Sequence, residues 1–246
     1  MNFRQTALAA TAALAFTQPA AAEMTDAERE TFRDEVRAYL MEHPEIIIEA
    51  VQSMETRQAE QAAANDVNLV RANADDIFDD GHSWVGGNPE GDVTLVEFMD
   101  YRCGYCRRAY EDVEKLIEED GNIRFVLKEF PILGEASTLS SRFAVATQQV
   151  AGDDAYKAVH DALMSYDGAY DPAALTRLAE GLGLDAQPIL AEMDSDEVNR
   201  ILSENHALAR RMQVNGTPTF ILDDQMLRGY VPYDGMKQIV AEMRAE

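Results

Sequence analysis

The stretch "VTLVEFMDYRCGYCRR", residues 93–108, contains both cysteines of this 246-residue chain, Cys103 and Cys106. Its first half is a nearly continuous run of apolar residues, which is typical of a strand that is buried on both faces. After the cysteines the chain continues as "RRAYEDVEKLIEED" with a helical spacing of apolar residues, and Gly121 follows as a helix C-terminal signal. The two cysteines are therefore expected at the junction of a buried strand and a helix.

The segments that follow this junction extend the pattern. "NIRFVLKEF", residues 122–130, is a second apolar run, so strand, turn, helix and strand follow one another within about 40 residues, as in a βαβ unit. Residues 135–212 carry apolar side chains at three- and four-residue spacing and predict a block of helices. "TPTFILDD" and "QMLRGY" then predict two strands, and residues 232–246 predict a closing helix. This order indicates an α/β fold with a helical insertion at about 135–212.

The region before the first strand has a different character, because residues 25–80 predict helices and no strand. Apolar positions keep a helical spacing on both sides of Pro44: Phe32, Val36, Leu40, Ile47, Val51 and Met54. Such a segment either caps its own domain or is an oligomerisation segment whose apolar stripe needs other chains. We favour oligomerisation, because an apolar-faced helix pair joined to a polar helix is untypical of an α/β core. Residues 82–92 are rich in Gly, Pro, Asn and Asp and predict a loop or linker.

The first residues have the composition of a secretory signal peptide: a basic start at Arg4, an apolar run over 7–16 and small residues at 20–22. A membrane anchor is the alternative, but the apolar run is too short to span a bilayer. We therefore predict a signal peptide at 1–22, an N-terminal helical oligomerisation segment at 23–81 and an α/β domain at 82–246.

Composition limits what the cysteine pair does. The formal net charge of −24 repels phosphate backbones and argues against nucleic-acid binding. Disulfides persist in the oxidising compartments that exported proteins reach, but this chain is long enough to bury a core without them. Two cysteines three residues apart also close too small a loop to restrain the unfolded chain. The pair therefore calls for a chemical explanation.

The C-x-x-C spacing allows four interpretations: half a zinc site, a copper-binding pair, a redox dithiol or an inert disulfide. Structural zinc takes four ligands, and the chain has no third cysteine. The histidines are scattered without ligand-like spacing: His43, His82, His160 and His206. We therefore expect neither a resident metal nor another cofactor, although two thiolates are able to bind Cu(I).

The position of the pair in a βαβ unit favours redox chemistry. Cys103 is expected at a helix N-terminus, where unpaired N–H groups and the helix dipole stabilise a thiolate. Three basic residues add local positive charge: Arg102, Arg107 and Arg108. Cys106 lies one turn further into the helix, so it is expected to be more buried and to act second, after the first thiolate has attacked a disulfide.

Together, "VTLVEFMDYRCGYCRR" and "VNGTPTFIL" resemble the two signature motifs of the DsbA-type thioredoxin-like thiol–disulfide oxidoreductases. The resemblance covers about residues 83–244, the two motifs together are highly specific, and it implies a thioredoxin fold interrupted by a helical insertion. It also implies that Cys103 is the nucleophile, that Cys106 is the resolving thiol and that Pro218 is a cis-proline facing them. Thr217 would then offer its backbone to a substrate peptide as an added strand.

Glu97 lies six residues before Cys103 inside the apolar strand. It is either an edge-strand carboxylate that points to water or, as the resemblance implies, a buried acid beneath the disulfide. In the second case it takes and returns the proton of Cys106, and burial raises its pKa toward the working range. Lys128 in the neighbouring strand is a candidate counter-charge.

Two features favour an isomerase over an oxidase. Gly104 and Tyr105 stand where the strongly oxidising members of the family have Pro-His, so the disulfide is expected to be less oxidising. With Thr217, this pair resembles the periplasmic disulfide isomerases of the DsbC kind, and we expect all three residues to contact substrate. "YLMEHPEIIIEAVQSMETR" resembles the leading helices of the suppressor-of-copper-sensitivity C (ScsC) proteins, DsbA-like enzymes of which some are trimeric isomerases.

These observations predict a periplasmic thiol–disulfide oxidoreductase with isomerase activity favoured. Its expected partners are exported proteins with cysteines, a membrane or soluble redox partner and further copies of the same chain, most simply as a trimer. A DsbA-like dithiol oxidase is the alternative, and a copper-binding thiol protein is a further one.

Overall fold

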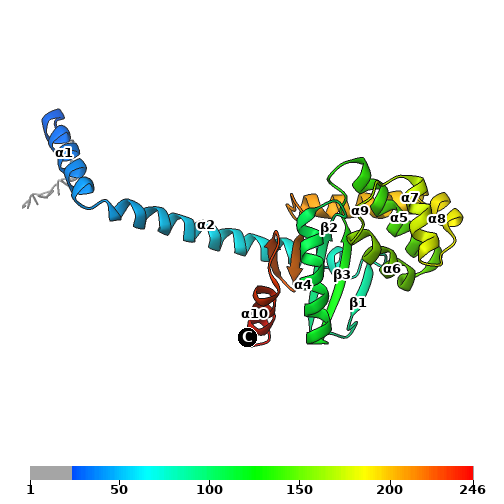
Figure 1. Ribbon diagram of the computed structural model, residues 1–246. Helices are drawn as coiled ribbons and strands as arrows, with labels where there is room; N and C mark the ends of the chain where they lie inside the picture. The colour runs from blue at the N-terminus through cyan, green and yellow to red at the C-terminus, as the bar shows by residue number, and fades with distance from the viewer. Residues whose placement is uncertain (1–23, 246) are drawn as a thin grey trace, which may run out of the picture. The chain divides into compact units, whose positions relative to one another are not determined.

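The computed structural model describes residues 24–245, so the predicted signal peptide lies outside the described residues. The described chain forms two compact units, and the division between them falls between Arg57 and Gln58, inside helix α2 (Glu45–Ala72) (Figure 1). Over the described residues, no helix is both long enough and apolar enough to cross a membrane.

The N-terminal unit contains helix α1 (Asp26–Glu42) and the first part of α2. Helix α1 begins with a capping box, in which the Glu28 amide donates to Thr25 Oγ1 and the Thr25 amide donates to Glu28 Oε2. Helix α1 buries none of its residues. Eight large apolar side chains of α1 and of the first part of α2 are exposed: Phe32, Val36, Tyr39, Met41, Ile47, Ile48, Val51 and Met54. Five of the six positions predicted for the apolar stripe are therefore exposed in a single chain, and the sixth, Leu40, is half-buried.

The C-terminal unit is built on a five-stranded sheet with the order β1-β3-β2-β4-β5. Its strands are β1 (Trp84–Gly87), β2 (Val93–Met99), β3 (Ile123–Glu129), β4 (Thr219–Leu222) and β5 (Gln225–Arg228). Strands β2 and β3 are parallel, and the other three pairings are antiparallel. The βαβ unit and the later pair of strands are thus confirmed.

One strand lies where the sequence predicts only a loop or linker. Residues 84–87 form β1, which pairs with β3 at an edge of the sheet. The Trp84 ring is buried against the rings of Phe125 and Tyr156, with centroids about 6 Å apart. The glycines around Trp84 hide this strand from a periodicity argument, because the segment is too short and too poor in side chains to alternate.

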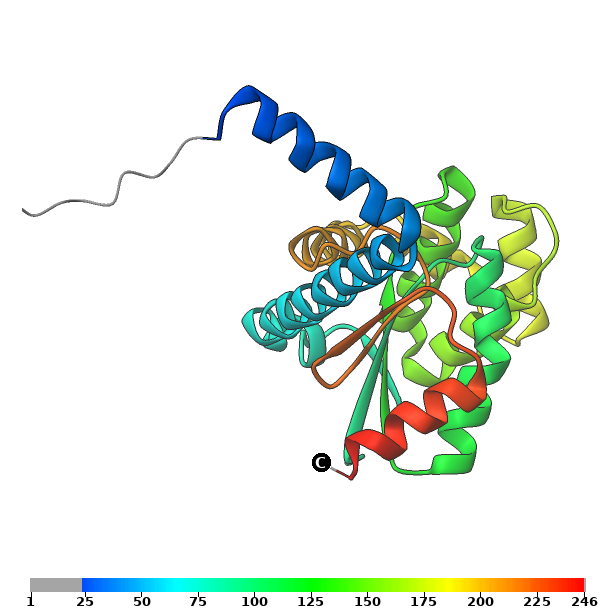
Figure 2. The same ribbon diagram turned by 90° about the vertical axis from the view of Figure 1, so that its left-hand side faces the viewer.

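Helices cover both faces of the sheet. Helix α4 (Gly104–Asp120) and helix α10 (Tyr233–Met243) lie side by side over one face (Figures 1 and 2). The opposite face packs against α9 (Asp196–Arg211), α3 (Ala74–Phe78) and the last turns of α2. Because Val70 and Ile77 are buried in this second layer, residues 58–81 belong to the same compact unit as the sheet.

The predicted helical insertion lies between β3 and β4. Its helices are α5 (Glu135–Ala151), α6 (Asp153–Met164), α7 (Pro172–Gly181), α8 (Ala186–Glu192) and α9. Pro172 occupies the first turn of α7, and the Asp171 side chain caps that helix by accepting a hydrogen bond from the Ala174 amide at 2.8 Å. Ten helices and five strands over the described residues therefore make a thioredoxin-like fold with the predicted insertion.

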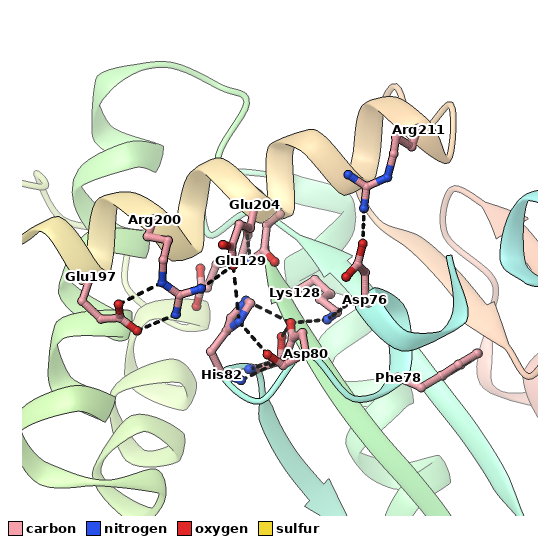
Figure 3. A network of polar contacts seen from close by, with 12 residues as sticks. Asp76, Phe78, Asp80, His82, Lys128, Glu129, Glu197, Arg200, Glu204 and Arg211 are labelled. Atoms are coloured by element: carbon pink, nitrogen blue, oxygen red, sulfur yellow. Dashed lines mark hydrogen bonds and ion pairs between the residues drawn. The ribbon is translucent and has the colours of Figure 1, made fainter. Parts of the chain in front are cut away.

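A buried ion pair fixes the segment that leads into β1. Lys128 is fully buried in β3, and its Nζ contacts Asp80 Oδ2 and donates to the Asp76 carbonyl at 2.8 Å (Figure 3). Asp80 Oδ1 in turn accepts the amides of His82 and Ser83. Burial acts to raise the pKa of Asp80, but its hydrogen bonds with His82 and Lys128 and the Lys128 charge hold that pKa well below its usual range.

The role suggested for Lys128 as counter-charge to Glu97 is wrong. The parallel register places Glu97 opposite Leu127 and Phe98 opposite Lys128. Because side chains alternate along a strand, Glu97 and Lys128 point to opposite faces of the sheet. Lys128 is paired on the face that packs against α3, away from the cysteines.

We expect Asp80→Asn to destabilise the protein by about 3–5 kcal/mol, because it leaves the Lys128 charge buried without a partner. The double variant Asp80→Asn/Lys128→Met should recover most of that loss. Urea unfolding monitored by circular dichroism measures both. As a control, Glu197→Gln removes an exposed partner of Arg200 and should cost at most about 1 kcal/mol. Equal losses for the buried and exposed pairs would contradict this account.

Candidate active site

A tight turn between β2 and α4 presents the two cysteines. Asp100 is fully buried at this turn, and its carboxylate accepts the amides of Arg102 at 2.8 Å, Ile132 at 2.8 Å and Leu133 at 3.1 Å. The Asp100 carbonyl accepts the Cys103 amide at 3.0 Å. This one side chain therefore fixes both the turn before the cysteines and the loop after β3.

Cys103 is the N-cap residue of α4, as the sequence predicts, and its side chain is only 7% exposed. Gly104 and Tyr105 form the first exposed residues of the helix, and the Tyr105 side chain is 63% exposed. Cys106 lies one turn inward and is fully buried in the core beneath α4. Both cysteines are free thiols.

The surroundings give the two sulfurs opposite acid strengths. A hydrogen bond from Cys106, with help from the Thr217 side chain and from the backbone of Cys106 and Tyr105, lowers the pKa of Cys103 to about 5, although burial opposes the shift. Burial raises the pKa of Cys106 far above its usual range, and the hydrogen bond to Cys103 and the Glu97 charge add to the effect. At neutral pH the site therefore holds a Cys103 thiolate beside a Cys106 thiol.

The loop before β4 lies against Cys103. The Thr217–Pro218 peptide bond is cis, as the sequence motif leads one to expect, and the Thr217 carbonyl oxygen is 3.1 Å from Cys103 Sγ. Strand β4 begins immediately afterwards, at Thr219, next to β2. The two motifs of the sequence, which are more than 100 residues apart, thus meet at one sulfur atom.

Glu97 is a buried acid on the cysteine side of the sheet. Its side chain is 3% exposed, and its Oε1 has no hydrogen-bond partner in the described protein. Burial, together with the nearby Cys103 and Glu114 charges, raises the pKa of Glu97 to about 8. The alternative of an edge-strand carboxylate that points to water is therefore wrong, and Glu97 is able to hold or release a proton near neutral pH.

Arg107 connects the cysteine turn to the helical insertion. Its Nε donates to the Tyr101 carbonyl at 2.8 Å, and its other nitrogens donate to the Tyr166 carbonyl and the Tyr170 hydroxyl and pair with Asp167. From the sequence, the positive charge of Arg107 is expected to stabilise the Cys103 thiolate. The geometry instead makes Arg107 a structural tie, and hydrogen bonds dominate the lowered Cys103 pKa.

Sequence reasoning misses a second buried acid near this turn. Glu129, at the end of β3, accepts hydrogen bonds from the hydroxyls of Tyr101 at 2.8 Å and Tyr156 at 2.7 Å (its position is labelled in Figure 3). Burial raises the pKa of Glu129 to about 7. Tyr101 also lies 3.2 Å from His160 Nδ1, and burial lowers the pKa of that histidine to about 3. A charged residue at the end of an apolar strand, as in "VLKEF", was the available signal.

Fold and site together define a thioredoxin-fold protein with two free cysteines at the start of one helix. Two family descriptions match the chain: "DSBA-like thioredoxin domain" over residues 94–241 and "Copper resistance protein ScsC N-terminal domain" over residues 28–61. The chain belongs to the DsbA-like thioredoxin family of thiol–disulfide oxidoreductases and carries an ScsC-type N-terminal region.

Solved structures of the same kind resemble the chain. A thioredoxin-like oxidoreductase from Silicibacter pomeroyi is 40% identical, with a TM-score of 0.66 over 71% of this chain and 99% of that one. Proteus mirabilis ScsC in a transitional conformation is 27% identical, with a TM-score of 0.67 over 90% of this chain and 99% of that one.

Among curated proteins, a Na⁺/H⁺ antiporter NhaA 3 from Salinispora tropica is 32% identical over 151 residues. These residues are 61% of this chain, which spans only 22% of the antiporter's length. Disulfide bond formation protein D of Bacillus subtilis is 23% identical over 63% of this chain and 74% of that protein.

The hydrogen bond from Cys106 should be visible in the alkylation of Cys103. In a Cys106→Ser variant a hydroxyl replaces the thiol donor, so alkylation by iodoacetamide should reach half its maximal rate near pH 5, as in the native pair. In Cys106→Ala the donor is lost, and the midpoint should rise by roughly one to two pH units. Identical profiles for the serine and alanine variants would show that this bond does not set the acidity of Cys103.

The raised pKa of Glu97 also makes a prediction about stability. Because its folded pKa of about 8 lies above the ordinary value of 4.5, folding takes up a proton between these values. The stability of the reduced protein should therefore fall as pH rises through this window, and Glu97→Gln should remove up to about 1.4 kcal/mol per pH unit of that fall. Urea unfolding across the window measures the difference, with the exposed Glu118→Gln as control. A difference that stays constant with pH would contradict a buried, neutral Glu97.

Proposed function

We propose that this protein is a periplasmic thiol–disulfide oxidoreductase that attacks and rearranges the disulfides of exported proteins, with isomerase activity favoured over dithiol oxidation. The observation that carries the proposal is the pairing of a thiolate with a protonated thiol at one helix N-terminus. Cys103 ionises near pH 5, while Cys106 behind it keeps its proton. A nucleophile and a separate resolving group are what two-step exchange requires.

In the first step the Cys103 thiolate attacks one sulfur of a client disulfide. A bond forms between Cys103 and that sulfur, the client S–S bond breaks, and the other client sulfur leaves as a thiolate. From this mixed disulfide two routes are open. A different client thiolate attacks the client sulfur and rearranges the disulfide, which regenerates the Cys103 thiolate without net oxidation. Alternatively, Cys106 attacks Cys103, which releases the client as a thiol and oxidises the enzyme.

The second route needs a base for Cys106, and Glu97 is the group available. The charge of Glu97 contributes to the raised pKa of the Cys106 thiol, which places the two groups in electrostatic contact within the core. With a pKa of about 8, Glu97 is able to accept the Cys106 proton as that sulfur attacks and to return it when the dithiol forms again.

The cis-proline loop is the proposed docking strand for the client. The Thr217 carbonyl lies 3.1 Å from Cys103 Sγ, so a client backbone hydrogen-bonded to this loop brings its disulfide to the nucleophile. The exposed Tyr105 side chain and the adjacent Gly104 are proposed to contact the same client on the helix side.

The N-terminal unit supports isomerisation by an oligomer. Its eight exposed apolar side chains form a surface of the kind that a soluble chain covers by association. The match of residues 28–61 to the ScsC N-terminal domain supports the same proposal. We propose that copies of this chain associate through this stripe, as a trimer, so that several dithiols face one misfolded client.

The proposed location and partners follow from the sequence and from the relatives. The signal-peptide composition of residues 1–22 fits export. A structural relative with 26% identity is described as a periplasmic thioredoxin-like protein from Salmonella enterica. An isomerase acts as a thiolate, so the proposal includes a membrane or soluble redox partner that returns the dithiol to its reduced form.

We expect the mature protein to reactivate scrambled ribonuclease, and Cys103→Ser to abolish that activity. Val51→Glu places a charge in the exposed stripe and should give a monomer with at least a severalfold lower reactivation rate. Ser53→Glu is the matched control, because it adds the same charge two residues away, on another face of α2. Sedimentation measures the oligomeric state of each variant, and the ribonuclease assay measures its reactivation rate. A dimeric or trimeric Val51→Glu protein, or a monomer with full activity, would contradict the role of the stripe.

If the protein oxidises reduced ribonuclease but leaves the scrambled form unchanged, a DsbA-like oxidase is the function. The description of the N-terminal family as a copper resistance protein gives a reason to test Cu(I) binding as well. Tight Cu(I) binding that depends on both cysteines, without turnover of protein disulfides, would favour the copper alternative.

A further inference from the structure

The arginines on either side of the cysteines have no function in the chemistry described above. Arg107 is half-buried and tied to the insertion, but Arg102 and Arg108 are exposed. Among residues 24–245 no carboxylate forms an ion pair with either of these two guanidinium groups. In this chain acidic residues outnumber basic ones by 45 to 21.

Both guanidinium groups are held in place by tyrosine rings from segments distant in the sequence. Arg102 lies over the Tyr170 ring at 5.2 Å, at the end of the loop between α6 and α7. Arg108 lies over the Tyr230 ring at 4.8 Å, just after β5. Stacking on an aromatic face orients a guanidinium while leaving its N–H groups free to bind an anion. Glu111 and Asp112 lie three and four residues after Arg108 on α4, and the Asp112 carboxylate accepts a hydrogen bond from the Tyr230 hydroxyl at 2.6 Å.

These two positive groups flank the nucleophile. Arg102 immediately precedes Cys103, and Arg108 lies in the second turn of α4, one turn beyond the exposed Tyr105. Their supports lie on different sides, one in the helical insertion and the other beside α10. Hydrogen bonds from Cys106, Thr217 and the backbone account for the lowered pKa of Cys103, and neither arginine is among its causes.

We propose that Arg102 and Arg108 form a recognition surface for acidic side chains next to the cysteine of a client polypeptide, so that this enzyme prefers disulfides in acidic segments. A protein with a net charge of −24 repels an acidic client over most of its surface. Two arginines without a carboxylate partner among residues 24–245, one directly before Cys103 and one in the second turn of the same helix, place positive charge near the nucleophile. Complementary charge at such a rim acts chiefly on the rate of encounter and on the choice of partner.

The inference rests on the proposed attack of Cys103 on client disulfides. Peptides that differ only in charge test the preference for acidic segments separately from that attack. Three peptides carry one cysteine flanked by Glu, Gln or Lys, each joined to pyridine-2-thiol as a mixed disulfide. Attack by Cys103 on the peptide sulfur forms the enzyme–peptide disulfide, breaks the original S–S bond and releases pyridine-2-thione, which takes up a proton. Stopped-flow absorbance measures this release at low and at high salt.

At low salt the reduced protein should react faster with the acidic peptide than with the basic one, by roughly three- to tenfold. Dividing each rate by that of the Gln peptide in the same variant cancels changes in the reactivity of Cys103 itself. The double variant Arg102→Gln/Arg108→Gln should bring the normalised ratio close to one, and high salt should do the same in the unmodified protein. Arg102→Lys/Arg108→Lys should keep a preference in the same direction.

Arg177→Gln is the matched control, because Arg177 is an exposed arginine of α7 outside the site, and its ratio should equal that of the unmodified protein. A normalised ratio of one in the unmodified protein, or a preference that survives in the double glutamine variant, overturns the inference. Failure of all three peptides to react would instead refute the nucleophilic role of Cys103, and the proposed function with it.

Discussion

The carboxylate of Asp100 is the constraint on which the site depends. By accepting three backbone N–H groups from two loops, it closes the turn between β2 and α4 and fastens the loop after β3 to the same point. A buried anion satisfied by three donors is tolerated in a core, whereas the same groups left unpaired would each carry a desolvation cost. The position of Cys103 and the start of α4 follow from the geometry of this turn.

Around that turn the protein gathers acids with quite different proton affinities. Glu97 and Glu129 lie on the same face of two adjacent strands, and burial raises the pKa of both into the range near neutrality. Glu97 is in electrostatic contact with the cysteines, whereas Glu129 is bound by the hydroxyls of Tyr101 and Tyr156. Two buried acids with pKa values near neutrality therefore lie on the cysteine side of the sheet. Asp80 pairs with Lys128 on the opposite face, where its hydrogen bond with His82 and the Lys128 charge hold its pKa well below the usual range.

Much of this organisation is predictable from the sequence, because the relevant signals are local. An apolar strand before the cysteines and a helical period after them indicate the fold and place Cys103 and Cys106 at one helix start. The meeting of Pro218 with the cysteines is predicted through the resemblance to a family. The burial of Glu97 is also predicted, but only through the resemblance to a family.

What the sequence does not reveal depends on pairing across the fold. The β2–β3 register decides that Lys128 faces away from Glu97, and nothing local to either residue contains that register. Arg107 provides another example, since its partners come from a loop about 60 residues later. The short strand at Trp84 is visible only once Phe125 and Tyr156 are placed beside it.

The burial of Val70 and Ile77 in the second layer of the core also bears on how such proteins diversify. Helix α2 is shared: its first turns carry exposed apolar residues, and its last turns complete the packing against the sheet. An exchange of N-terminal regions between relatives is tolerated only if the junction falls upstream of these last turns. The glycine-rich segment before β2 has the composition of a linker between domains. Recombination there would remove Val70 and Ile77 and leave an apolar face of the sheet exposed. The helix is thus a shared structural element and sets the point at which one module is separable from the other.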